Sequence, residues 1–96
     1  MSTYICLSNW TQKGVENIKE SPARLDAARE EWGKHGVTIR DVFMTMGQYD
    51  LVFVVDAPDE ATLAKVMLTQ ASKGGIRTTT LRAYPESEYR AIIGSL

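Results

Sequence analysis

The chain has 96 residues, 44% of them apolar and 24% charged, which fits one globular domain with a modest core. Eleven basic and twelve acidic residues give a formal net charge of −1, which argues against a nucleic-acid-binding protein, because such a protein needs Lys and Arg clustered on one face. One cysteine and one histidine exclude an internal disulfide and a zinc site built from Cys and His ligands, and we expect no metal and no cofactor.

No apolar run reaches the roughly 20 residues that a membrane-spanning helix needs. The first ten residues carry no basic residue ahead of their apolar stretch, which is untypical of a secretory signal. We therefore expect a cytoplasmic protein without membrane contact.

The first predicted strand spans residues 3–9, and its side chains alternate between two faces. Ile5 and Leu7 point to one face. The other face carries Tyr4, Cys6, Ser8 and Trp10. Both faces carry bulk, so neither is predicted to be simply exposed to water.

Helical signals follow this strand. A short turn is expected around residues 14–18, and Ser21 with Pro22 is typical of an N-cap followed by a proline in the first helical turn. The helix is predicted to end near Gly36, a residue suited to a left-handed helix end. Its buried stripe is predicted to be Leu25, Ala28, Arg29 and Trp32.

Residues 37–46 are predicted to form a strand whose alternation slips at Arg40 and Asp41, which indicates a bulge. A turn beginning at Gly47 leads into a further strand from Asp50, with five consecutive apolar residues typical of a central strand. We expect the two strands to pair as a hairpin, because the connection between them is short.

A second helix is predicted from Pro58 to Lys73. Small residues are expected to form its buried face: Ala61, Ala64, Met67 or Leu68, and Ala71. The last strand, residues 76–84, contains three consecutive threonines, which favour β-structure. Residues 85–96 follow as a tail of the same single domain, with one or more helical turns.

The order of these elements predicts an α+β fold of the ferredoxin-like kind, βαββαβ, over residues 1–84. Right-handed crossovers place both helices on one face of a four-stranded antiparallel sheet. The other face has no cover within one chain, and its simplest partner is a second copy related by a two-fold axis. The side chains expected on that face are Tyr4, Cys6, Ser8, Trp10, Thr78, Thr80, Arg82 and Tyr84.

The segment Gly47-Gln48-Tyr49-Asp50 resembles the G-x-Y-D signature for which the GYD domain family is named. Other segments that resemble this family are Gly14, Ser21 to Arg24, Ala57 to Glu60 and Gly74 to Ala83. The resemblance implies the dimeric α/β-barrel group, in which two protomers pack sheet to sheet. It implies no activity. A weaker resemblance connects the same signature to the effector-sensing domains of leucine-responsive regulators, which assemble into rings of dimers.

Two interpretations of Tyr49 and Asp50 stay open. In one, Asp50 is a base or a ligand anchor at the end of a strand, and Tyr49 donates a hydrogen bond. In the other, Asp50 accepts hydrogen bonds from turn amides, and the Tyr49 ring packs on a neighbour.

Arg82 also has two interpretations. A guanidinium among the hydroxyls of Thr78 and Thr80 suits a carboxylate or phosphate ligand. The same group suits an ion pair to an acidic residue of a second copy. His35 is predicted to cap a helix end, and Cys6 to be an inert buried thiol.

Together these patterns predict a homo-oligomeric small-molecule-binding or regulatory module whose sheet-to-sheet dimer forms the pocket. The ligand is expected to be a small anion or an amino-acid-like molecule. Its predicted binding residues are Tyr4, Trp10, Tyr49, Asp50, Thr78, Thr80 and Arg82. One alternative is a cofactor-independent enzyme of the monooxygenase, isomerase or dehydratase type, which needs a cavity holding an ionisable group of perturbed pKa. A second alternative is a structural assembly unit without a ligand.

Overall fold

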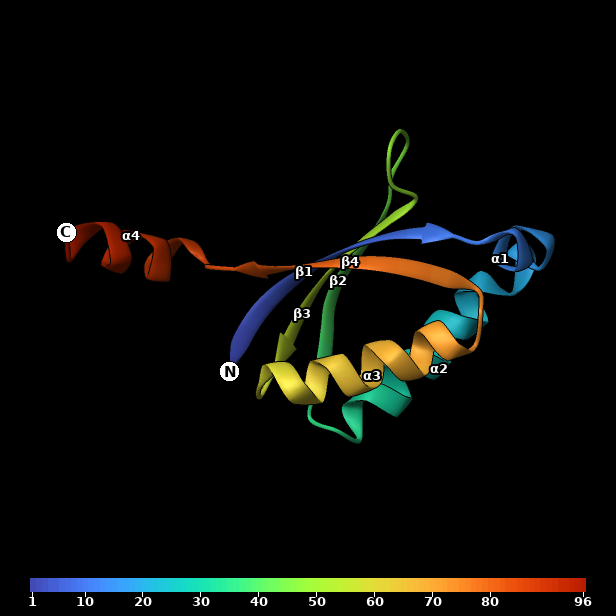
Figure 1. Ribbon diagram of the computed structural model, residues 1–96, viewed down its shortest axis with the longest axis horizontal. Helices are drawn as coiled ribbons and strands as arrows, with labels where there is room; N and C mark the ends of the chain where they lie inside the picture. Colours follow the sequence, from blue (N-terminus) through green and yellow to red (C-terminus); the bar gives the residue numbers. More distant parts are fainter.

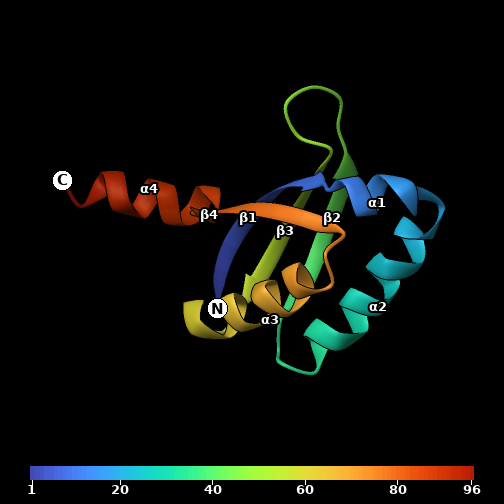
Figure 2. The ribbon, with the colours of Figure 1, turned by 45° about the vertical axis from the view of Figure 1, so that its right-hand side comes forward.

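In a computed structural model, which describes all of residues 1–96, four strands form one antiparallel sheet in the order β2-β3-β1-β4. The elements in chain order are β1 (Ser2–Trp10), α1 (Gln12–Glu16), the 3₁₀ turn η1 (Ile18–Glu20), α2 (Ser21–Gly33), β2 (Thr38–Met44), β3 (Leu51–Ala57), α3 (Glu60–Ser72), β4 (Ile76–Ala83) and α4 (Glu86–Gly94). The two long helices, α2 and α3, lie on the same side of the sheet (Figures 1 and 2). This arrangement confirms the predicted α+β, ferredoxin-like fold. No helix is long and apolar enough to cross a bilayer.

The connection from β1 to α2 is made of two short helical segments. The Thr11 side chain caps α1 by accepting a hydrogen bond of 3.1 Å from the Gly14 amide. The turn η1 then runs directly into α2, so Ser21 is the first helical residue and not the predicted N-cap. Pro22 occupies the first turn, as predicted.

α2 packs on the sheet through Ala28 and Trp32, which are buried, and through Leu25, which is partly buried. The predicted stripe is therefore confirmed at three positions. It is wrong at Arg29, which is exposed. Arg29 lies at the edge of the apolar stripe, and the edge of a helix that packs on a small sheet faces water. The chain leaves the helix through Gly36, whose φ of 76° favours glycine.

The pairing of β2 with β3 shifts register between Ile39 and Asp41, which confirms the predicted bulge. The extra residue changes which side chains face the helices. Ile39 and Val42 are three residues apart, yet both lie opposite buried residues of β3. Phe43 consequently points to the other side of the sheet.

α3 begins at the N-cap Asp59, whose Oδ1 accepts a hydrogen bond of 2.7 Å from the Thr62 amide. This bond holds the pKa of Asp59 below its ordinary value. The buried residues of α3 are Leu63 and Val66, which corrects the prediction of a small-residue face. Of the residues predicted for that face, Met67 is partly buried against the core, and Ala61, Ala64, Leu68 and Ala71 are exposed. Two stripes share the helical period, and the one with the larger aliphatic side chains gains more from burial.

The helix-covered side of β1 carries Tyr4, Cys6 and Ser8, each less than 5% exposed. The prediction that these three side chains lie on the uncovered face is wrong, and it is also wrong for Thr78, Thr80 and Arg82, which pair with them from β4. Two of them have polar partners within the sheet, since the Ser8 hydroxyl lies 2.8 Å from that of Thr78 and the Cys6 thiol bonds to Thr80. Hydrogen-bonded polar groups are inexpensive to bury, which lets Ser8 and Cys6 lie beneath the helices.

The predicted helical tail is confirmed as α4, which extends from the end of β4 away from the rest of the molecule (Figure 1). Tyr89, Ile92 and Ile93 are spaced as one side of a helix, and all three are exposed. An ion pair of 3.7 Å between Arg82 Nη2 and Glu88 Oε1 connects the helix to β4.

Candidate functional site

The sheet surface opposite α2 and α3 is apolar at its centre and has no cover within the chain; we call it the open face. Its apolar side chains are Ile5, Leu7, Phe43, Val52, Val54 and Leu81. They form two rows across the strands: Ile5 lies between Val54 and Leu81, and Leu7 lies beside Val52. None of the six is buried, and Phe43 is 57% exposed.

One end of the open face is polar and internally paired. The Asp56 carboxylate accepts a hydrogen bond of 2.9 Å from the Thr3 hydroxyl through Oδ1. Its Oδ2 lies 3.1 Å from Arg40 Nε. Arg40 follows Ile39, which faces the helices, so alternation places Arg40 on the open face. The open face therefore combines an apolar centre with a polar border, which is the usual anatomy of a protein interface.

Asp50 joins the end of β1 to the loop before β3. Its Oδ2 accepts a hydrogen bond of 3.0 Å from the Trp10 amide, and its own amide donates one of 2.9 Å to the Ser8 carbonyl. Its carbonyl accepts from the Thr45 amide at 2.8 Å, and the Thr45 hydroxyl donates to the Tyr49 carbonyl. One interpretation predicted that the Asp50 carboxylate accepts hydrogen bonds from backbone amides of the turn. It does accept one from a backbone amide, but that amide belongs to Trp10 in β1. A ligand role for Tyr49 and Asp50 stays a prediction.

Arg82 is engaged on several sides. Its guanidinium lies over the rings of Tyr84 and Tyr4, at 4.4 and 5.7 Å from the ring centres. Nη1 donates to the carbonyls of Thr3, at 3.2 Å, and of Ala83. Together with the ion pair to α4, these contacts make Arg82 the junction between β1, β4 and α4. Its role as a ligand anchor stays a prediction.

The remaining predicted site residues are Tyr4, Trp10, Thr78 and Thr80, and they lie at different positions along β1 and β4. Tyr4, Thr78 and Thr80 lie on the same side of the sheet as the helices, and burial raises the pKa of the neighbouring Cys6 thiol to about 11. Cys6 is thus buried and neutral at physiological pH. Trp10 lies at the far end of β1, beside a cavity between α2 and the sheet. Within one protomer Arg82 contacts Tyr4 and Asp50 bonds to the Trp10 amide, and a ligand site made of all seven residues stays a prediction.

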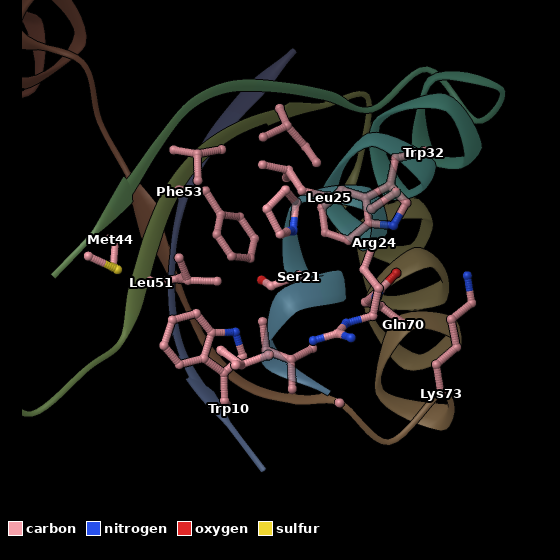
Figure 3. A pocket seen from close by; sticks show the side chains of 17 residues that line it. Trp10, Ser21, Arg24, Leu25, Trp32, Met44, Leu51, Phe53, Gln70 and Lys73 are labelled. Carbon is pink, nitrogen blue, oxygen red and sulfur yellow. The ribbon is translucent and has the colours of Figure 1, made fainter. Parts of the chain in front are cut away.

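That cavity has a volume of about 380 Å³, and Gln70 and Lys73 line it from the end of α3 (Figure 3). Its wall is mostly apolar and includes three aromatic residues: Trp10, Trp32 and Phe53. Trp32 and Phe53 contact each other with ring centres 6.1 Å apart. Two basic residues, Arg24 and Lys73, also line it, and neither was predicted as a site residue. No local pattern indicates them, because Arg24 in α2 and Lys73 at the end of α3 approach Trp10 only in the folded chain.

A model of the GYD domain matches residues 4–93, which include most of α4. The chain belongs to the GYD domain family. It is 38% identical over 89 residues to a Thermus thermophilus protein named "Glutamine synthetase and cystathionine beta-lyase binding protein", and the match covers 92% of this chain and 94% of that protein. No solved structure matches the chain. The similar protein is named for binding other proteins, which fits a small binding module of the predicted kind.

Proposed function

We propose that this GYD-domain protein is a homo-oligomeric binding module that pairs with a second copy through its open face and attaches to metabolic enzymes through α4. The observation that carries the proposal is the open face itself. Two central strands present apolar side chains there, and the chain supplies no element to cover them. The name of the Thermus thermophilus relative supports enzymes as the further partners.

The second copy is the occupant that suits the open face best. A two-fold axis through Ile5 and Val54 would place the apolar rows of two copies against each other, as in sheets that pack at about 10 Å. Burying each large aliphatic or aromatic side chain contributes about 1.5–3 kcal/mol. The paired Asp56 and Arg40 would remain at the border, where water still reaches them.

Val54→Asp tests this pairing, because it places one carboxylate in the middle of the face. We expect the variant to remain folded by circular dichroism and to sediment as a single protomer, while the wild-type protein sediments as a dimer or a multiple of dimers. Thr79→Asp introduces the same group on the same face on edge strand β4, and we expect a smaller effect from it. A wild-type protein that sediments as one protomer would contradict the pairing.

α4 is the element best suited to an enzyme partner. It extends away from the sheet, and its exposed Tyr89, Ile92 and Ile93 form an apolar stripe of the kind that enters a groove on another protein. The family match includes this helix, so it belongs to what the chain shares with its relatives.

The experiment uses glutamine synthetase and cystathionine beta-lyase purified from the organism of the chain, each measured by surface plasmon resonance. We expect Ile92→Asp to reduce the affinity for the enzyme at least tenfold. Ala91→Asp places the same charge on the opposite side of the helix, and we expect it to bind as the wild type does. If neither enzyme binds wild-type protein, or if both variants bind equally well, the enzyme-binding role of α4 is wrong.

The enzyme alternative has no observation in its favour. The cavity lining contains no Asp, Glu, His, Cys or Tyr side chain. The two groups with a resolved pKa shift, Cys6 and Asp59, lie outside this cavity. The binding module is therefore the function that we propose, and the enzyme alternative stays a prediction.

A further inference from the structure

The cavity beneath α2 has an unbalanced charge. Arg24 and Lys73 are its only charged lining residues, and Gln70 and Ser21 are its other polar side chains. Most of the remaining wall is apolar. A cavity with cations and no carboxylate favours an anion, and an apolar wall favours an anion that carries an apolar body.

Arg24 has hydrogen-bonding capacity to spare. Its Nη1 donates to the Asn17 carbonyl at 3.0 Å and lies 3.8 Å from Glu20 Oε2. Its Nη2 is buried and makes no hydrogen bond, and no other buried side-chain polar atom in the chain lacks a partner. A buried donor without a partner is costly, so such an atom asks for an explanation. An anion in the cavity would receive this hydrogen bond if the guanidinium turned to bring Nη2 to the cavity wall.

The wall beside Arg24 is fixed by the main chain. A Cβ on Gly75 would lie at an ordinary van der Waals distance, 3.6 Å, from Arg24 Nε, so Arg24 passes close to the main chain at the entry to β4. The Gly75 carbonyl accepts a hydrogen bond of 3.2 Å from the Thr11 amide. A Cβ on Gly14 would meet that carbonyl at 2.1 Å, so Gly14 is required for the close approach. Figure 3 shows Arg24 reaching from α2 toward Trp10 across this wall.

We propose that this cavity binds a small monocarboxylate with an aromatic or branched apolar body. Its carboxylate would accept hydrogen bonds from Arg24, and its body would lie against Trp10, Trp32 and Phe53. A volume of 380 Å³ holds about a dozen non-hydrogen atoms if each takes the roughly 30 Å³ of a water molecule. The cavity lies on the opposite side of the sheet from the open face, so this proposal does not depend on the proposed function.

The chain provides its own optical probe, because it has two tryptophans and both line the cavity. The experiment titrates wild-type protein with 4-phenylbutyrate and with 4-phenylbutyramide, its uncharged counterpart, and follows tryptophan fluorescence. We expect saturable binding of the acid, at least tenfold tighter than that of the amide.

Arg24→Met keeps the length of the side chain and removes its charge. We expect it to weaken binding of the acid roughly 10- to 100-fold and to remove the preference over the amide. Arg29→Met, on the exposed side of the same helix, is the matched control and should bind as the wild type does. Arg24→Lys keeps the charge without the planar fork and should give an intermediate affinity.

Two results would overturn the proposal. Equal affinities of the wild-type protein for acid and amide would mean that the cavity recognises no anion. A fluorescence spectrum unchanged by millimolar acid would mean that the cavity admits no such molecule. If Arg24→Met loses its circular dichroism signal, the comparison of acid with amide in wild-type protein and in Arg24→Lys decides the matter.

Discussion

The two faces of the sheet differ in what covers them. On the helix-covered face, Ser8 and Cys6 are fully buried, although both carry polar atoms. On the open face, Leu7 and Val52 remain accessible, although both are aliphatic. A face is buried when something covers it, whatever its composition. The chain covers the first face with its own helices, and we propose that a second copy covers the other.

The two phenylalanines separate these faces most strongly, because they carry the same side chain on opposite sides of the sheet. Phe53 is 7% exposed and lies in the core, whereas Phe43 is on the open face. We expect Phe53→Ala to reduce the free energy of unfolding by about 3–5 kcal/mol at any protein concentration. We expect Phe43→Ala to change the stability of the separated protomer by less than about 1 kcal/mol and to weaken the dimer.

Urea denaturation at two protein concentrations, with sedimentation velocity alongside, distinguishes these effects. Equal losses of protomer stability in the two variants would mean that Phe43 is as important to the protomer core as Phe53.

The pKa of the Cys6 thiol depends on how completely the helices exclude water from their side of the sheet. Its pKa is about 11 in the folded protein and 9.0 for an unperturbed thiol, because burial disfavours the thiolate. Between pH 9 and 11 the unfolded chain loses the thiol proton while the folded chain keeps it. The thiol therefore contributes its full stabilisation of the folded state below pH 9, and this contribution is lost as the pH rises toward 11. The difference corresponds to roughly 2–3 kcal/mol.

The measurement is the free energy of unfolding by urea as a function of pH, for the wild-type protein and for Cys6→Ala. The variant should lack the decline that the wild-type protein shows above pH 9. Parallel curves for the two proteins would mean that the thiol ionises freely and that this side of the sheet is open to water.

Arg82 stabilises the border of the helix-covered face, where β4 continues into α4. Arg82→Met removes the hydrogen bonds to the Thr3 and Ala83 carbonyls, and we expect a loss of about 1.5–3 kcal/mol in the free energy of unfolding. Glu88→Gln removes only the partly exposed ion pair and should cost less than about 1 kcal/mol.

These two variants also test the ligand role predicted for Arg82. If Arg82→Met leaves stability unchanged but weakens binding of 4-phenylbutyrate, then Arg82, and not Arg24, anchors the carboxylate.

Local patterns in the sequence were sufficient for the fold. The slip at Arg40 and Asp41 predicted the bulge, and the spacing of Leu25, Ala28 and Trp32 predicted the face of α2. These predictions succeed because period and turn chemistry are properties of neighbouring residues.

The faces of β1 and α3 were not predictable in the same way. Alternation divides β1 into two sets, but it does not say which set meets the helices. Ser8 can be buried because its hydroxyl pairs with that of Thr78, and Thr78 lies seventy residues later in the chain. In α3 the alanines offered a plausible stripe, and only the packed core favours Leu63 and Val66.

The candidate site depends even more on tertiary contacts. Asp50 was recognised as notable, but its bond to the Trp10 amide joins residues 40 positions apart. The cavity needs Arg24 from α2 beside Gly75 from the loop before β4, which no local pattern brings together. Trp10 is the one predicted site residue that lines the cavity.

Native mass spectrometry of the wild-type protein at micromolar concentration would show whether another copy of the chain covers the open face. We expect a dimer or a multiple of dimers. A well-folded single protomer, with the open face accessible to water, would mean that no second copy binds there.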